Sequence, residues 1–103
     1  MAKTRFTVIW EFRVRNGQNK QFENAYGKEG RWVKLFSEIP EYRGTQLLRD
    51  MANANRYITI DRWDSYDAYE SFRKLHESEY KAIDQICGNL TEREIEIGRF
   101  EEI

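Results

Sequence analysis

The segment from residue 6 to residue 14 constrains the fold most strongly, because its side chains alternate between two faces and both faces carry apolar residues. One face holds Phe6, Val8, Trp10, Phe12 and Val14. Ile9 lies on the other face, between Thr7 and Glu11. This period of two is typical of a β-strand. A sheet that contains the segment therefore needs cover on both of its faces.

Three further segments alternate in the same way. Residues 45–51 and 57–63 flank a short loop rich in Asn, so we expect them to form a hairpin. Leu47 and Leu48 are adjacent and point to opposite faces, and Ile58 and Ile60 oppose Tyr57 in the same way. Residues 93–100 alternate isoleucine with glutamate, which predicts a final strand.

Two stretches have apolar residues at helical spacing. The first ends before Pro40 and contains Gly27 and Gly30, which predict a bend or an interruption. The second is predicted to start at the N-cap Ser65 and to end at Gly88. The resulting order is βαββαβ. It predicts an α+β, ferredoxin-like fold, with a four-stranded antiparallel sheet and two helices on one face.

We expect one domain over residues 1–103, since a chain of 103 residues is too short for two. Two helices cover only one sheet face, and the other face keeps its apolar side chains. An uncovered apolar face of this kind usually marks a protein interface, and two-fold dimers are the commonest assemblies. The sequence thus predicts a homodimer through the sheet face, which is the dimeric α+β barrel.

Charge and cysteine content restrict the partners. Lys plus Arg number 17 and Asp plus Glu number 18, so we expect neither a nucleic acid nor a membrane surface as partner. Cys87 is the only cysteine, so no intrachain disulfide is expected. Residues 1–5 lead directly into the first strand without an apolar leader, and no apolar run has the length of a membrane span. These features predict a cytoplasmic protein.

Familiar chemical motifs are absent from the sequence. No phosphate-binding loop follows a strand and no nucleophile elbow occurs. His76 and Cys87 are the only histidine and the only cysteine, so we expect no metal site and no cofactor.

Three polar side chains are candidates for catalysis: His76, Asp61 and Arg49. His76 would act as a general base or a hydrogen-bond partner of a substrate, although a histidine in such a position is more often a helix-face residue at the edge of the core. Asp61 shares a strand face with Trp63. Cross-strand ion pairs between the Arg49-Asp50 and Asp61-Arg62 segments would explain these charges without any ligand.

Aromatic residues supply a possible binding surface. The candidates for substrate binding are Trp63, Phe72, Tyr80, Tyr69, Trp32 and Tyr26. They are expected to form either an ordinary core or a cleft between sheet and helices that accepts a flat aromatic molecule.

Several motifs, spread over nearly the whole chain, resemble one known family. They include Tyr26-Gly27 with Gly30 and Trp32, Leu47-Leu48-Arg49-Asp50, the strand from Tyr57 to Trp63 with Ser65 and Ala68 behind it, and Ile97-Gly98 with Phe100-Glu101. Together they resemble the antibiotic biosynthesis monooxygenase domain of the dimeric α+β barrel superfamily.

This resemblance implies a sheet-to-sheet dimer with a cleft in each protomer. Some members oxidise polyphenolic rings with molecular oxygen and no cofactor, and the substrate anion supplies the electron. Haem-degrading members have an Asn in the first strand and a late histidine in the second helix. This chain has neither, with Asp84 near the position of that histidine.

The resemblance therefore predicts a cofactor-independent monooxygenase acting on a small hydroxylated aromatic compound. In this hypothesis the ring stacks on Trp63 and Phe72, His76 or Asp61 takes a proton, and Arg49 or Tyr80 stabilises the anion. The alternatives are a non-catalytic ligand-binding or structural dimer, and an isomerase or lactonase on the same fold.

Overall fold

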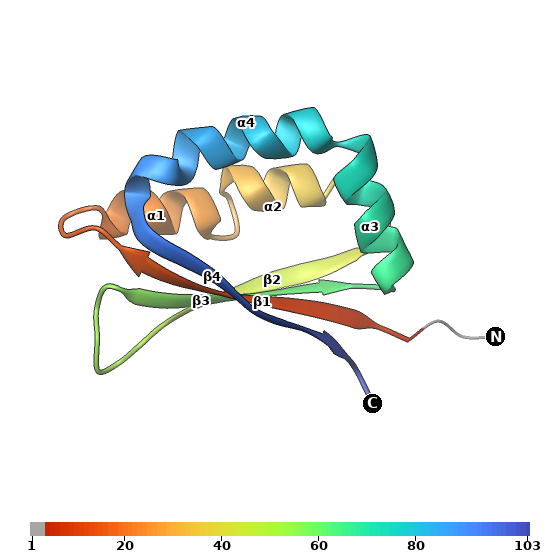
Figure 1. Ribbon diagram of the computed structural model, residues 1–103, viewed down its shortest axis with the longest axis horizontal. Coiled ribbons are helices and arrows are strands. Elements are labelled where there is room, and N and C mark those ends of the chain that lie inside the picture. The colour runs from red at the N-terminus through yellow and green to blue at the C-terminus, as the bar shows by residue number, and fades with distance from the viewer. Residues whose placement is uncertain (1–3) are drawn as a thin grey trace.

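The computed structural model describes residues 4–103 and contains one four-stranded sheet with helices on one of its faces (Figure 1). The elements are β1 (Phe6–Val14), α1 (Asn19–Tyr26), α2 (Arg31–Phe36), β2 (Tyr42–Arg49), β3 (Arg56–Trp63), α3 (Tyr66–Leu75), α4 (Glu77–Cys87), the short 3-10 helix η1 (Gly88–Leu90) and β4 (Thr91–Glu101). The strand order is β2-β3-β1-β4, and every neighbouring pair is antiparallel. The predicted α+β, ferredoxin-like fold is confirmed.

Alternation along the two central strands separates a buried face from an open one. The residues of β1 and β3 that point toward the helices are buried: Phe6, Val8, Phe12, Val14, Tyr57, Thr59, Asp61 and Trp63. The register places Val8 opposite Asp61 and Phe12 opposite Tyr57. The core therefore lies between the sheet and the helices, and two polar residues, Thr59 and Asp61, belong to its sheet side.

The first helical stretch is interrupted at its glycines, as predicted. α1 ends at Tyr26, and α2 begins at Arg31. A Cβ atom at Gly30 would lie 2.1 Å from the carbonyl oxygen of Ala25, and one at Gly27 would lie 2.6 Å from that of Glu23. No side chain fits at such distances, so the two glycines permit the close turn that directs α2 across the sheet.

The second helical stretch is also divided, which the sequence did not predict. α3 ends at Leu75, α4 starts at Glu77, and His76 between them has φ −114° and ψ 30°. Ser65 caps α3 as expected and accepts a hydrogen bond from the Ala68 backbone N–H at 3.1 Å. The change of direction at His76 places α4 beside α2, above the sheet (Figure 1). Tertiary packing, rather than a helix-breaking residue, selects this junction.

A bulge in β2 changes which side chains point inward. Gly44 has φ +116°, and the pairing of β2 with β3 shifts register between Tyr42 and Gly44. In a regular strand, residues three apart such as Tyr42 and Thr45 would point to opposite faces. The bulge brings both to the helix side, since an extra residue in one strand reverses the alternation.

The helix-free face of the sheet is apolar at its centre. Its residues include Ile9, Leu48, Ile58, Ile60, Ile95 and Phe100, of which Leu48 is 46% exposed and Phe100 is 45% exposed. Within the described residues no helix covers this face (Figure 1). None of the helices among residues 4–103 has both the length and the apolar character needed to cross a membrane. Residues 1–3, part of the N-terminal stretch considered above, lie outside the described residues.

Candidate active site

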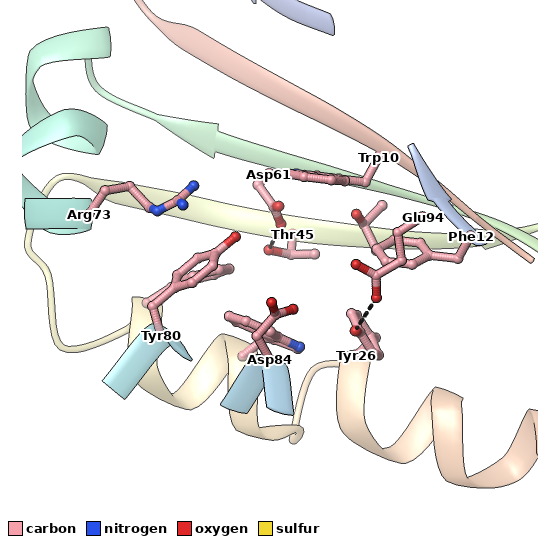
Figure 2. Close-up of a pocket in the computed structure, with 12 residues that line it drawn as sticks. Trp10, Phe12, Tyr26, Thr45, Asp61, Arg73, Tyr80, Asp84 and Glu94 are labelled. Carbon is pink, nitrogen blue, oxygen red and sulfur yellow. Dashed lines mark hydrogen bonds between the residues drawn. The ribbon is translucent and has the colours of Figure 1, made fainter. Parts of the chain in front are cut away.

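A cavity of about 180 Å³ lies between the sheet and the helices (Figure 2). Apolar cavities of about 150 Å³ hold one benzene molecule, so this space suits a single substituted ring. Side chains from eight elements line it: Trp10, Phe12, Tyr26, Trp32, Phe36, Thr45, Thr59, Asp61, Arg73, Tyr80, Asp84 and Glu94.

Six of the twelve lining residues are aromatic, and several of their rings pack against each other. Tyr26 and Trp32 have ring centroids 6.1 Å apart, and Trp32 meets Tyr80 edge to face at 4.8 Å. Trp10 and Phe12 both lie on the cavity wall, because residues two apart on a strand point to the same side, which here faces the helices. The indole N–H of Trp32 is buried and has no acceptor among the described residues.

Asp61 is the buried charge of the cavity. It is 8% exposed, and its recorded hydrogen bond comes from the Thr45 hydroxyl, with an Oγ1 to Oδ1 distance of 2.5 Å. No Lys, Arg or His of the described chain forms an ion pair with it. Burial raises the pKa of Asp61 to about 6, although the Thr45 hydrogen bond acts in the opposite direction. This carboxyl can therefore exchange a proton near neutral pH.

A short chain of hydroxyl groups leads to this carboxylate. The Tyr42 hydroxyl lies 2.5 Å from Thr45 Oγ1. Because Thr45 has one hydroxyl proton and donates it to Asp61, Tyr42 donates in turn to Thr45. The β2 bulge makes this arrangement possible by turning Tyr42 and Thr45 to the same face.

Arg73 supplies the positive charge on the cavity wall. Its guanidinium carbon lies 3.9 Å from the Tyr80 ring centroid, and one guanidinium N–H donates to the Tyr69 hydroxyl at 2.8 Å. Burial raises the pKa of Tyr80 well above its usual range, so that hydroxyl stays protonated. Arg73 is thus held by two tyrosines and faces the carboxylates of the cavity (Figure 2).

Two more carboxylates lie where the cavity meets solvent. Asp84 comes from α4 and Glu94 from β4, and both residues are exposed at their outer sides. The Tyr26 hydroxyl lies 3.5 Å from Glu94 Oε1 and donates to it. Burial, and then the negative charge of Asp84, raise the pKa of Glu94. Figure 2 shows Asp84 and Glu94 directed into the space between helices and sheet.

Residues 5–83 match the model of one protein family, described as antibiotic biosynthesis monooxygenase. The chain belongs to the antibiotic biosynthesis monooxygenase family. No curated protein matches the chain at a significant level.

Solved structures share this family's fold with the chain. SnoaB, a cofactor-independent oxygenase from Streptomyces nogalater, is 22% identical, with 97% of this chain and 94% of SnoaB covered and a TM-score of 0.77. A protein from Caulobacter crescentus is 16% identical, with 98% and 92% covered and a TM-score of 0.80. Pseudomonas aeruginosa PA3566 is 12% identical, with 100% and 98% covered and a TM-score of 0.73. At these identities the likeness establishes the fold.

Of the residues expected from the sequence to form the site, four line the cavity: Asp61, Tyr80, Trp32 and Tyr26. Trp63, Phe72 and Tyr69 lie in the core, each 3% exposed or less. A ring bound in the cavity of this family member would therefore meet the lining side chains rather than stack on Trp63 or Phe72.

Arg49 and His76 lie outside the cavity lining. Arg49 is at the far end of β2 and pairs with Glu23 at 3.5 Å. His76 joins α3 to α4, stacks on Phe72 with centroids 5.5 Å apart, and shares a hydrogen bond of 2.9 Å between Nδ1 and Glu79 Oε2. The structure thus separates both residues from Asp61, because the junction and the strand end point them elsewhere.

The expected cross-strand ion pairs are wrong. Asp61 lies opposite Thr45, and Arg49 lies opposite Tyr57. Arg62 donates to Gln46 Oε1 at 2.8 Å instead of pairing with a carboxylate. The hairpin register places Arg49, Asp61 and Arg62 opposite uncharged residues, and Asp50 pairs instead with Arg56 at 3.1 Å.

Two features outside the cavity bear on the sequence-based expectations. Glu38, His76 and Glu79 bring one potential metal ligand each to within 4.8 Å of one another, on a largely exposed surface away from the cavity. Cys87 is buried, and burial raises the pKa of its thiol, which makes it a packing residue rather than a nucleophile.

Sequence reasoning did not select Thr45, Arg73 or Glu94 for the site. A signal for Arg73 was present, since Arg73, Tyr80 and Asp84 recur at spacings of seven and four residues on one side of a helical stretch. For Thr45, the signal required the register of β2 against β3, where Thr45 lies opposite Asp61. For Glu94, it required the register of β4 against β1, where Glu94 lies opposite Phe12.

Proposed function

We propose that this protein is a cofactor-independent monooxygenase that oxidises a small hydroxylated aromatic compound in the cavity beside Asp61. The observation that carries the proposal is a buried carboxylate without a cationic partner, on the wall of a cavity lined by aromatic rings. Its pKa of about 6 suits a general base near neutral pH. Membership of the family and the fold shared with SnoaB, a cofactor-independent oxygenase, support the same reaction class.

The chemistry needs only the substrate and molecular oxygen as electron donor and acceptor. Asp61 takes the proton of a phenolic hydroxyl, and the electron-rich phenolate transfers an electron to oxygen. The two radicals combine at a ring carbon ortho or para to the hydroxyl that carries a hydrogen, and protonation by Asp61 gives a hydroperoxide.

Breakage of the peroxide bond completes the reaction. The ring carbon loses its hydrogen to Asp61 and becomes a carbonyl, and the leaving hydroxide receives that proton and departs as water. In total, one phenol and one oxygen molecule give one quinone and one water. The phenol supplies all four electrons.

Other lining residues have supporting roles in this proposal. Arg73 stabilises the phenolate, the role that the sequence suggested for Arg49, because its guanidinium lies on the cavity wall. Thr45 holds the Asp61 carboxylate in position through its hydrogen bond. The rings of Trp10 and Trp32 flank the substrate and exclude water.

Oxygen uptake tests the proposal. Dihydroxybenzenes and other substituted single-ring phenols are added to the purified protein in an oxygen electrode, and the rate of substrate autoxidation is subtracted. We expect one oxygen molecule consumed per substrate, with one atom of labelled oxygen in the quinone and one in water. Asp61→Asn should lower the rate by about 100-fold or more, because general-base catalysis contributes at least that much.

Glu92→Gln provides the matched control, since Glu92 is an exposed acid of β4 that does not line the cavity. It should retain the full rate. Uptake no greater than that of heat-denatured protein contradicts the oxygenase proposal and favours a non-catalytic binding protein. A rate that Asp61→Asn leaves unchanged contradicts the role of Asp61.

We propose further that the active form is a homodimer through the helix-free sheet face. Members of the family are commonly dimeric. The apolar centre of this face, with Ile9, Ile58 and Ile60, is only partly shielded in one chain. Pairing two such faces would close a barrel and leave each cavity on the outer side. A monomeric mass in light scattering at micromolar concentration would contradict this assembly.

A further inference from the structure

The cavity carries an excess of negative charge. Among its lining residues, Asp61, Asp84 and Glu94 are acidic, and Arg73 is basic. At a pH where all four are ionised, three negative charges face one positive charge. Like charges that face one cavity repel each other, and this repulsion is one reason for the raised pKa of Glu94.

None of these three carboxylates forms an ion pair within residues 4–103. Arg73 does not neutralise them, because its guanidinium stacks on Tyr80 and donates to the Tyr69 hydroxyl. Asp61 is 8% exposed, with one hydrogen bond to Thr45, and its side chain points into the cavity (Figure 2). A buried carboxylate in this state gains from a cationic or hydrogen-bond-donating ligand.

The walls also favour a cation. Trp10, Tyr26, Trp32 and Tyr80 all contribute rings to the lining. The faces of aromatic rings attract ammonium groups, most strongly those of tryptophan. Aromatic rings combined with carboxylates are the usual surroundings of a bound organic ammonium group.

Size limits the rest of the ligand. The cavity volume of about 180 Å³ leaves room for one substituted ring and not for a fused polycyclic skeleton. Asp61 lies at the sheet, and Asp84 and Glu94 lie nearer the mouth, so the two ends of a ligand meet different carboxylates (Figure 2).

We propose that the site selects a single-ring phenol that carries an ammonium group, and that it rejects phenols that carry a carboxylate. The hydroxyl points to Asp61, and the ammonium lies between Asp84 and Glu94. This inference rests on the proposed function for the role of the hydroxyl, and it adds the charge and size of the substrate.

Three phenols of matched size and different charge test the selectivity: tyramine, 4-ethylphenol and 3-(4-hydroxyphenyl)propionate. Their dissociation constants are measured by isothermal titration calorimetry without oxygen, so that binding is separated from turnover. We expect tyramine to bind more tightly than 4-ethylphenol, and about tenfold or more tightly than the propionate. Equal or tighter binding of the propionate overturns the proposal, as does the absence of tyramine binding.

Substitutions locate the preference. Asp84→Asn combined with Glu94→Gln leaves one carboxylate facing one guanidinium, so the ratio of the tyramine and propionate constants should fall toward one. Glu92→Gln makes the same kind of charge change outside the cavity and should leave the ratio unchanged. Asp84→Asn alone, at an exposed position that tolerates substitution, should give an intermediate ratio. A ratio unaffected by Asp84 and Glu94 overturns the assignment.

Together, the binding and oxygen-uptake measurements distinguish a failure of the charge selectivity from a failure of the oxygenase proposal. Selective tyramine binding with no oxygen uptake would contradict the proposed function and leave the charge selectivity in place. Oxygen uptake with uncharged phenols, together with no preference for tyramine, would contradict the selectivity and leave the oxygenase proposal in place.

Discussion

Replacing Asp61 by asparagine should stabilise the protein at neutral pH, because the native fold holds this carboxyl where ionisation is unfavourable. Burial raises its pKa from 3.8 to about 6. An unfolded chain has no such burial, so its carboxyl ionises at the lower value. The folded state is therefore penalised whenever Asp61 is ionised, and asparagine removes the penalty while it keeps the shape of the side chain.

The sign and the size of the effect follow from linkage. Below the unfolded pKa the carboxyl is neutral in both states, and there is no penalty. As the pH rises from about 4 to about 6, the unfolded state loses its proton first, and the native state loses stability. Above the folded pKa the penalty is complete, at about 3 kcal/mol for a shift of about two pKa units.

Urea unfolding of both proteins at a fixed concentration measures this difference. The informative quantity is the free energy of unfolding of Asp61→Asn minus that of the wild type, because the titration of all other groups cancels. It should increase by about 2 kcal/mol between about pH 4 and about pH 7.5. A constant offset is expected from the altered hydrogen bond to Thr45, and this offset does not depend on pH.

Glu92→Gln, an exposed acid on β4, should show no comparable increase. If the difference for Asp61→Asn stays flat with pH, the native pKa of Asp61 is not raised. If the variant instead becomes less stable relative to the wild type as the pH rises, the carboxylate is stabilised in the native state, and the reasoning from burial is refuted.

Three further outcomes are expected. Thr45→Val removes the hydrogen bond that lowers the pKa of Asp61, so the acidic limb of the pH profile of kcat/KM should move up by about one pH unit, whereas Thr45→Ser should leave it in place. Gly30→Ala forces a Cβ atom against a backbone carbonyl oxygen and should lower the free energy of unfolding by about 2 kcal/mol or more, whereas Gly88→Ala, which meets no atom within 4 Å, should be close to neutral in the same urea titration. Ile58→Lys places a charge on the helix-free sheet face and should reduce the mass in light scattering from dimer to monomer with an unchanged circular dichroism spectrum; a persistent dimer would exclude this face as the interface.

Local patterns were sufficient for the order of elements and for the sheet. The alternation along residues 6–14 and 57–63 identified the two central strands, because a period of two reflects the pleat itself and needs no partner. Gly27 and Gly30 marked the interruption between α1 and α2, since the cost of glycine in a helix is also local. Ser65 marked the start of α3 for the same reason.

Contacts between distant segments decided the site. Thr45 reaches Asp61 because the hairpin register places the two residues opposite each other, and the bulge before Gly44 turns Tyr42 to the same face. Arg73 and Tyr80 come from two helices that meet at His76, and both line the cavity. The same junction removes His76 from the cavity. The hydrophobic pattern of a single segment does not predict these contacts, because they depend on which segments meet in the fold.

The sequence by itself determined that an apolar two-faced sheet would form and that Asp61 would share a strand face with Trp63. The tertiary structure alone decided that this carboxylate has a threonine and no cation for a partner, and that Asp84 and Glu94 face the same cavity. The physical reason is the separation along the chain of the residues that interact. Hydrogen-bond geometry and burial depend on which segments meet, whereas strand and helix periodicity depend only on neighbours along the chain.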